Sequence, residues 1–264
     1  MSTLNKITTE KYATLTNLKK KISIEMLEKK ISSYTNFIDF KKKLKNESSK
    51  ISVIAEIKKS SPSAGVIVDD YNPKIIAKNY FDGGASCLSI LTEEKFFLGK
   101  LEHINEVKNV IKLPILCKDF FIDPFQVYLS RAAGADAILI ILSAIDYSLA
   151  VELYELANKL KLTTIVEVHT EEEAKKALYF KESIIGINNR NLTTLKTDIS
   201  TTFRLYEILN NHSQPLISES GIKTKNEIEE IVEKTKINNF LIGESLLTSK
   251  NISSSLRKLT QISL

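Results

Sequence analysis

The chain has 264 residues, 43% of them hydrophobic and 26% charged, a composition that excludes wholesale disorder and suits one large globular domain. Its net charge of +5 comes largely from short lysine clusters such as residues 19–21 and 41–43, which lack interleaved aromatic side chains and therefore favour solvated helix faces over nucleic-acid binding. No apolar run approaches the roughly 20 residues that span a membrane, so we expect a cytoplasmic protein without a membrane partner.

Residues 1–50 are expected to form a helical extension, because their apolar residues recur at helical spacing. These residues are Leu4, Ile7, Leu15 and Leu18, then Ile24, Leu27 and Ile31, then Phe37, Phe40 and Leu44. The extension would either cap the bottom of the following domain or form a lid over its mouth. The sequence leaves both roles open.

From residue 51 onward, short β-branched apolar runs alternate eight times with amphipathic stretches. The runs cover residues 51–57, 86–91, 114–117, 136–142, 163–168, 184–187, 216–218 and 239–242. Such runs are typical of parallel strands covered on both faces. They predict an α/β fold, a single (β/α)8 TIM barrel domain over residues 1–264. An open doubly wound sheet would also alternate, but it usually has a glycine-rich first turn, and none follows Ile57.

Helix-start signals fall between the runs, where a βα alternation requires them. Two signals place a capping side chain before a proline at the first helical position, namely Asn72-Pro73 and Asp123-Pro124. Two more have the spacing of a capping box, namely Thr170 with Glu173 and Thr224 with Glu227.

The two cysteines, Cys87 and Cys117, lie inside predicted strands. Their spacing matches neither a redox pair nor a metal cluster. We therefore expect buried free thiols and no metal site.

Polar residues end most of the predicted strands, and in a closed barrel the carboxyl ends of the strands form the active site. Glu56 and Lys58 are two residues apart, so they lie on the same side of the first strand. The other polar ends are Lys118-Asp119, Glu167 with His169, Asn188, and Glu219. Any one of them alone would usually be a partner in a stabilising ion pair. Together, two lysines and three glutamates would shift one another's pKa, as acid–base catalysis requires.

Small residues follow the last two predicted strands, as Ser220-Gly221 and Gly243-Glu244-Ser245. Backbone N–H groups in such turns approach a phosphate closely, and barrels frequently bind phosphate in the loops after strands seven and eight. The positive net charge modestly favours an anionic substrate as well. We expect a small phosphorylated molecule as the partner.

The segment IAEIKKSSPS at residues 54–63 resembles the signature of the indole-3-glycerol-phosphate synthase family. Further resemblances follow in family order in every βα unit, at residues 88–99, 118–124, 131–136, 166–169, 186–192, 218–222 and 240–246. Residues 4–7 resemble the family's N-terminal helix, so the extension is expected to be a family feature. Two departures, Cys117 and Leu247-Thr248, lie away from the expected chemistry.

The resemblance implies a reaction of tryptophan biosynthesis, catalysed by a lyase of the carboxy-lyase class. The substrate would be 1-(2-carboxyphenylamino)-1-deoxyribulose 5-phosphate, and the product indole-3-glycerol phosphate, with loss of carbon dioxide and water. No metal or redox cofactor is required.

Catalytic roles are implied for six of the polar residues. Lys118 matches the family's general acid, and Glu167 matches the residue that handles protons in the dehydration. Lys58 matches a lysine near the substrate carboxylate and phosphate, and is a second candidate acid. The remaining three match residues that orient the lysines and substrate hydroxyls, namely Glu56, Asn188 and Glu219.

Substrate contacts are implied for a further set of residues. Those matching the phosphate pocket are Ser61, Ser220, Gly221, Gly243 and Glu244, the last through its backbone. Phe97 and Phe120 match aromatic residues of the anthranilate pocket, although plain core packing would also explain them. His169 and Arg190 are typical of the family, either as substrate contacts or as supports behind the site.

Three alternatives stay open at this point. Another phosphate-binding barrel enzyme, such as phosphoribosylanthranilate isomerase, would share the phosphate site but would not need both Lys58 and Lys118. A non-catalytic phosphate-ligand binder is the second alternative. A basic nucleic-acid-binding protein is the third, and is disfavoured because the lysines form no single stripe. Weak self-association, or association with a neighbouring pathway enzyme, is left open.

Overall fold

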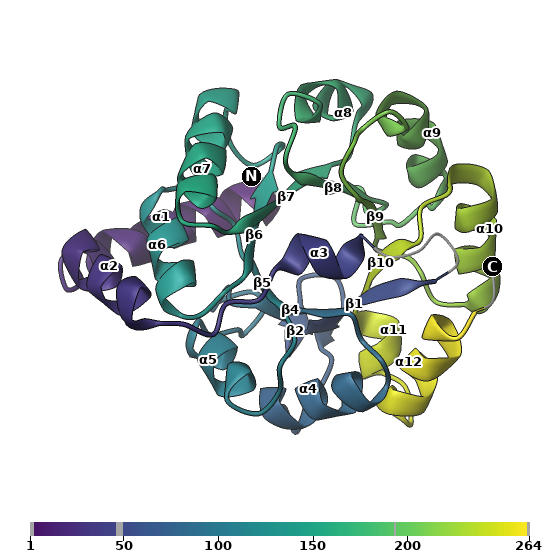
Figure 1. The fold of residues 1–264 in the computed structure, drawn as a ribbon, viewed down its shortest axis with the longest axis horizontal. Coiled ribbons are helices and arrows are strands. Elements are labelled where there is room, and N and C mark those ends of the chain that lie inside the picture. The colour runs from purple at the N-terminus through teal and green to yellow at the C-terminus, as the bar shows by residue number, and fades with distance from the viewer. Residues whose placement is uncertain (1–2, 46–49, 193, 263–264) are drawn as a thin grey trace.

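The computed structural model describes residues 3–45, 50–192 and 194–262. Within these ranges, eight parallel strands close into a barrel in which β1 pairs with both β10 and β4 (Figure 1). The barrel strands are β1 (Ser52–Ile57), β4 (Cys87–Leu91), β5 (Ile115–Lys118), β6 (Ala137–Ile141), β7 (Thr163–Val168), β8 (Ile184–Asn188), β9 (Leu216–Glu219) and β10 (Asn239–Ile242). Each predicted run forms one of these strands, so the predicted barrel is confirmed.

Helices surround the barrel on its outer face, as Figure 1 shows. They are α4 (Pro73–Asp82), α5 (Glu102–Lys108), α6 (Phe125–Ala132), α7 (Tyr147–Lys159), α8 (Glu171–Ala177), α9 (Ser200–Leu209), α10 (Lys225–Thr235), α11 (Glu244–Leu247) and α12 (Ile252–Thr260). A large buried apolar cluster joins them to the strands. Both faces of each strand are therefore covered, which explains why the strands are almost continuously apolar.

A second apolar cluster fills the barrel interior with every second residue of the strands. Its strand members include Ile54, Leu116, Ile165, Ile184, Ile217 and Leu241. The alternate residues of the same strands, such as Val53 and Ala55, pack toward the helices instead. This two-residue period decides which side chains at the strand ends point into the barrel mouth.

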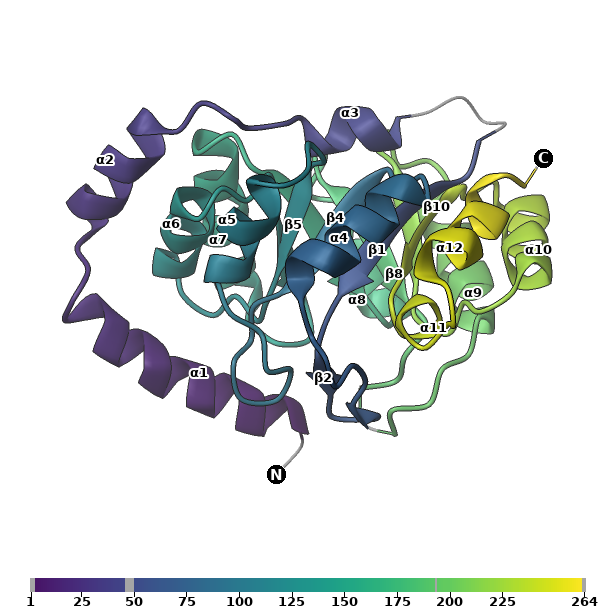
Figure 2. The same ribbon diagram turned by 90° about the horizontal axis from the view of Figure 1, so that it is seen from below.

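The N-terminal extension spans the height of the barrel on its outside. It comprises α1 (Thr3–Lys19), α2 (Ile24–Ser33) and α3 (Phe40–Leu44), and residues 46–49 of the expected extension lie outside the described residues. Leu15 and Leu27 pack against Phe125 of α6. Figure 2 shows α3 across one end of the barrel and α1 at the opposite end, where the hairpin of β2 (Ser60–Ser61) and β3 (Gly65–Val66) also lies.

Parts of the extension lie at both ends of the barrel. Phe40 and Leu44 of α3 are fully buried in the interior cluster, so α3 caps the bottom of the barrel. Leu4 and Ile7 of α1 line the cavity at the mouth. Phe37 was expected to continue the last helical face, but it precedes α3, and its ring packs on the guanidinium of Arg131 at 3.2 Å.

Helix caps agree with the sequence in part. Asn72 caps α4 ahead of its proline, and Thr224 forms a full capping box with Glu227. At α6 the prediction was wrong by one position, because Pro124 is the cap residue, although the Asp123 carboxylate still accepts a hydrogen bond from the backbone N–H of Phe125. The remaining box is incomplete. Thr170 caps α8, but the carboxylate of Glu173 accepts a hydrogen bond from the backbone N–H of His169 and not from that of Thr170.

Cys87 and Cys117 are buried free thiols, as expected. No helix in the described ranges combines the length and apolar character needed to cross a bilayer. Over the same residues, no cluster of His, Cys, Asp and Glu side chains is arranged to hold a metal ion.

Candidate active site

The inward-facing positions of the strands change from apolar to polar near the carboxyl end of the barrel. Three inward-facing residues of the interior cluster, Ile54, Leu116 and Ile165, are each followed two positions later by a charged residue. Because strand side chains alternate between the two faces, these charged residues point inward too. The charged residues are Glu56, Lys118 and Glu167. The same step leads from Ile217 to Glu219 and, over four residues, from Ile184 to Asn188. The sheet geometry therefore brings residues from five strands to one place.

A cavity of about 750 Å³ lies at this end of the barrel. Its lining contains all fourteen residues to which the sequence assigned catalytic or substrate-binding roles: Glu56, Lys58, Ser61, Phe97, Lys118, Phe120, Glu167, Asn188, Arg190, Glu219, Ser220, Gly221, Gly243 and Glu244. Among the described residues of the lining, His169 is absent. The size of the cavity suits a small organic ligand.

Lys118 lies at the centre of the polar cluster. Its Nζ is 2.8 Å from Glu219 Oε2, and it lies 3.5 Å from Glu167 Oε2 and 4.0 Å from Glu56 Oε2. Burial opposes its charge, but the three carboxylates outweigh burial and raise the pKa of Lys118 above its ordinary value. Lys118 is therefore a cation at neutral pH that faces the cavity.

The three carboxylates differ in the additional cations near them. Lys58 lies 2.6 Å from Glu56, so that, despite burial, Lys58 and Lys118 lower the pKa of Glu56. Burial likewise acts to raise the pKa of Glu167, but Lys118, His169 and Asn188 lower it to about 2.

Glu219 is the carboxylate of this cluster that retains a proton most readily. Over the described residues, Lys118 is the one cation within ion-pair distance of it. Burial, together with the nearby charge of Glu167, outweighs Lys118 and raises the pKa of Glu219 to about 7. At neutral pH the cluster therefore contains a lysine cation, an ionised carboxylate and a carboxyl that titrates, an arrangement suited to proton transfer.

The opposite side of the mouth is made of small residues in the loops after β9 and β10. Ser220 and Gly221 have φ angles of 69° and 79°, a left-handed conformation that is costly for a serine. The side chain of Asn189 fixes this turn, because its Nδ2 donates hydrogen bonds to the Ser220 carbonyl and the Ser218 hydroxyl, both at 3.1 Å. Gly243 begins the first turn of α11, where leading N–H groups have no acceptor within the helix.

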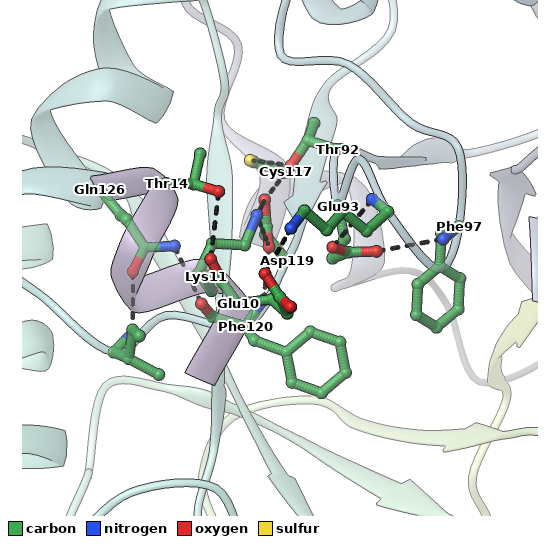
Figure 3. A network of polar contacts seen from close by, with 12 residues as sticks. Glu10, Lys11, Thr14, Thr92, Glu93, Phe97, Cys117, Asp119, Phe120 and Gln126 are labelled. Carbon is green, nitrogen blue, oxygen red and sulfur yellow. Dashed lines mark hydrogen bonds and ion pairs between the residues drawn. The ribbon is translucent and has the colours of Figure 1, made fainter. Parts of the chain in front are cut away.

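Two aromatic rings line the cavity beside this cluster. Phe97 and Phe120 come from the loops after β4 and β5, and their ring centroids are 6.2 Å apart. Glu93 shapes the first loop, because one of its oxygens accepts hydrogen bonds from the N–H groups of Phe96 and Phe97 (Figure 3). The two phenylalanines therefore offer an apolar surface at the mouth, in addition to any packing role.

Helix α1 is fixed to the same two loops. Figure 3 shows Lys11 reaching Asp119, and its Nζ lies 2.8 Å from Asp119 Oδ1 with both side chains almost buried. Asp119 also accepts hydrogen bonds from the Thr92 hydroxyl at 2.7 Å and from its neighbour's backbone, the N–H of Phe120, at 2.8 Å. A more exposed ion pair joins Glu10 to Lys95. The extension is thus anchored beside Lys118 and both rings.

Arg190 lines the cavity while its guanidinium is engaged by the protein. Nη1 donates a hydrogen bond to the Leu195 carbonyl at 2.8 Å and a longer one to the Ser63 hydroxyl at 3.4 Å. These bonds connect the loop after β8 to the loop after β1, so in this structure Arg190 supports the mouth.

Comparison with known proteins gives this arrangement a family. The sequence profile of indole-3-glycerol phosphate synthase matches residues 4–259. The chain belongs to this family. An indole-3-glycerol phosphate synthase from Endomicrobium trichonymphae is 41% identical over 242 residues, which cover 92% of each chain. Another, from Prochlorococcus marinus subsp. pastoris, is 40% identical over 261 residues, covering 97% of this chain and 88% of the relative.

Solved structures support the fold independently of the synthase family's sequence pattern. A mutant tryptophan synthase α-subunit from Pyrococcus furiosus superposes with a TM-score of 0.62 at 13% identity. The superposition covers 81% of this chain and 100% of that chain. At this identity the likeness concerns the barrel alone.

Sequence reasoning missed several residues of this synthase-family site. The apolar floor of the cavity includes Leu139, Ile141 and Leu241, which the strand pattern alone would have marked as inward-facing. Asn189, which holds the Ser220 turn, follows a predicted strand and offered a weak signal of the same kind. Lys11 offered none, because its partner lies 108 residues away in the chain.

Proposed function

We propose that this chain closes the pyrrole ring of indole-3-glycerol phosphate, starting from 1-(2-carboxyphenylamino)-1-deoxyribulose 5-phosphate. The observation that carries the proposal is the position of Lys118, held by three carboxylates at a cavity with an aromatic wall and a rim of small residues. Membership of the family supports this reaction over the isomerase alternative. Because carbon dioxide is released, the enzyme would be a carboxy-lyase.

Ring closure requires an acid beside the substrate ketone. The aromatic carbon attacks the carbonyl carbon, and the carbonyl oxygen takes a proton as the new bond forms. Lys118 is charged and faces the cavity, so we assign it as this general acid. Loss of carbon dioxide then restores the aromatic ring.

The remaining hydroxyl leaves as water while a neighbouring proton is removed. Glu167 is ionised and lies 3.5 Å from Lys118, so we assign it to handle protons in this step. Lys58, which faces the same cavity, is the second candidate acid and a partner for the substrate carboxylate. Glu56, Asn188 and Glu219 orient these groups through the contacts described above.

The anionic end of the substrate would bind at the rim of small residues in the loops after β9 and β10. Our assignment uses the side chain of Ser61 and backbone groups of Ser220, Gly221, Gly243 and Glu244, because small residues let N–H groups approach a phosphate. Phe97 and Phe120 would hold the anthranilate ring between them and the catalytic cluster.

The test is product formation by the purified protein, followed by the fluorescence of the indole ring with EDTA present. We expect Lys118→Ala to lower kcat by about a thousandfold, the scale of a lost general acid. Lys159→Ala, at an exposed position at the end of α7, should match the wild type. Full activity in Lys118→Ala would refute the assigned mechanism, and a wild type that binds substrate without converting it would support a non-catalytic binder.

A further inference from the structure

Glu173 does not complete the capping box that its spacing predicts. The Thr170 hydroxyl accepts a hydrogen bond from the N–H of Glu173, but the Glu173 carboxylate turns to the residue before Thr170. Its Oε2 accepts a hydrogen bond from the His169 backbone N–H at 2.7 Å, and lies 3.3 Å from the ring nitrogen Nδ1 of His169. One carboxylate therefore fixes both the backbone and the ring of His169.

The other ring nitrogen of His169 faces the catalytic cluster. Nε2 lies 3.3 Å from Oε1 of Glu167, whose other oxygen is the one that faces Lys118. A neutral imidazole has a single N–H and satisfies one acceptor, whereas an imidazolium donates from both nitrogens. Nε2 is buried without a hydrogen bond to the described residues in this geometry, but the two carboxylates within 3.3 Å of the ring stabilise its positively charged form through their charge.

We propose that Glu173 and His169 act as a positioning relay that holds Glu167 ionised and correctly oriented for the reaction. His169 itself is absent from the described lining of the cavity, and its side chain is only 10% exposed. It would therefore act on the reaction through Glu167 and not by touching substrate. The expected effect of the relay on turnover rests on the function proposed above. The expected charge of His169 does not.

The charged groups around the relay are consistent with this role. His169 directly follows β7 and faces Glu167 on that strand and Glu173 on α8; although burial disfavours its charge, these carboxylates raise the pKa of His169 to about 10. Glu167 also faces Lys118 on β5 and Asn188 on β8, while the neighbouring carboxylates Glu56 and Glu219 approach the same lysine. Of the three cluster carboxylates Glu56, Glu167 and Glu219, Glu167 is thus the one that His169 contacts among the described residues.

The charge of His169 is directly measurable by NMR, because the chain has only three histidines. Their imidazole signals can be assigned by replacing His103 and His212 with glutamine, one at a time. In the wild type we expect His169 to stay protonated from pH 6 to pH 8.5. In Glu173→Gln, which removes one of the two carboxylates, its titration should move to lower pH by at least one unit.

Kinetics of the same variants test the consequence for Glu167. We expect Glu173→Gln and His169→Gln to lower kcat about tenfold or more, with KM within threefold, a loss comparable to that seen when an orienting partner is removed. Without the imidazolium, the pKa of Glu167 rises, so the acid limb of the kcat profile of His169→Gln should move up by a pH unit or more. The matched control is Glu172→Gln, one residue away on α8 and 78% exposed.

Two results would overturn the relay. One is a wild-type His169 that titrates near pH 6.5, which would mean that its ring is mostly neutral at the pH of the activity assay. The other is a Glu173→Gln protein that matches Glu172→Gln in both kcat and histidine titration. If the wild type lacked synthase activity altogether, the proposed function would fail while the titration still decided the charge state of His169.

Discussion

Two glycines make room for the carboxylates that surround Lys118. Gly186 lies in β8 and Gly243 directly follows β10, and a Cβ on either would lie 2.6 Å from a carboxylate oxygen, of Glu219 and Glu56 respectively. Gly186 lies within a regular strand and has no positive φ, so the backbone there would accept another residue. The absence of a side chain at each glycine therefore leaves the space that the neighbouring carboxylate occupies.

We expect Gly186→Ala to cost activity and little stability. The new methyl group displaces the flexible end of Glu219, and with it the 2.8 Å contact to Lys118, so kcat should fall by about tenfold. The free energy of unfolding in urea should change by less than about 1 kcal/mol.

Gly83→Ala provides the reciprocal control for that variant. Its Cβ would lie 3.0 Å from Leu256 Cβ, far from the cavity, so it should lower stability and leave kcat unchanged. An equal loss of stability in the two variants, with kcat preserved in Gly186→Ala, would contradict the interpretation.

The polar residues of the site were predictable from sequence because barrel topology brings all strand ends to one rim. Glu56, Lys118 and Glu219 needed only their positions after apolar runs. The relay through Glu173 was not predictable from the sequence. The spacing lets that carboxylate bind the backbone N–H of either Thr170 or His169, and the position of the His169 ring decides between them.

At the scale of elements, helix α1 depends on one buried ion pair more than on its exposed contacts. Lys11 and Asp119 are each about 10% exposed or less, whereas the side chains of Lys95 and Glu10 are about half exposed. Breaking a buried pair leaves an uncompensated charge, while solvent screens an exposed pair.

We therefore expect Lys11→Met to destabilise the protein by about 3 kcal/mol, because Asp119 would stay buried without its cation. KM should rise too, since α1 lines the cavity with Leu4 and Ile7. Lys95→Met should cost less than about 1 kcal/mol. Urea denaturation and steady-state kinetics on both variants provide the comparison, and similar losses in the two would show that the buried pair has no special role.

Element positions followed closely from sequence, while element roles did not. Every barrel strand lies within a residue or two of its apolar run, since burial on both faces leaves little latitude. The extension's helices were expected from their periodicity, but their destinations depended on contacts far along the chain. Phe40 of α3, for example, belongs to an interior cluster that contains residues from all eight barrel strands.

At the scale of the whole molecule, the buried site affects how stability varies with pH. The pKa of Glu219 is raised to about 7 and that of His169 to about 10, so each favours folding most below its ordinary pKa and loses that contribution as pH rises. Glu167 has the opposite sign. Its pKa is lowered to about 2, so its contribution is present above its ordinary value and is lost in acid.

We expect the thermal midpoint to be highest on the acid side of neutrality and to fall between pH 6 and pH 9. In Glu219→Gln the decline up to about pH 7 should flatten, and in His169→Gln the decline above pH 7 should flatten. Scanning calorimetry in buffers of constant ionic strength measures both slopes. A wild-type midpoint that rises steadily from pH 6 to pH 9 would show that these groups do not govern the dependence.

Helix α3, which caps the bottom of the barrel, has a consequence for synthesis on the ribosome. Phe40 and Leu44 are translated before any strand, yet they are buried with Leu241 of β10, the last strand of the barrel. At about 5–20 residues per second, translation keeps these two apolar side chains waiting for roughly ten seconds or longer. Closure of the ring between β1 and β10 is therefore the event that completes the hydrophobic environment of one of the earliest segments to emerge.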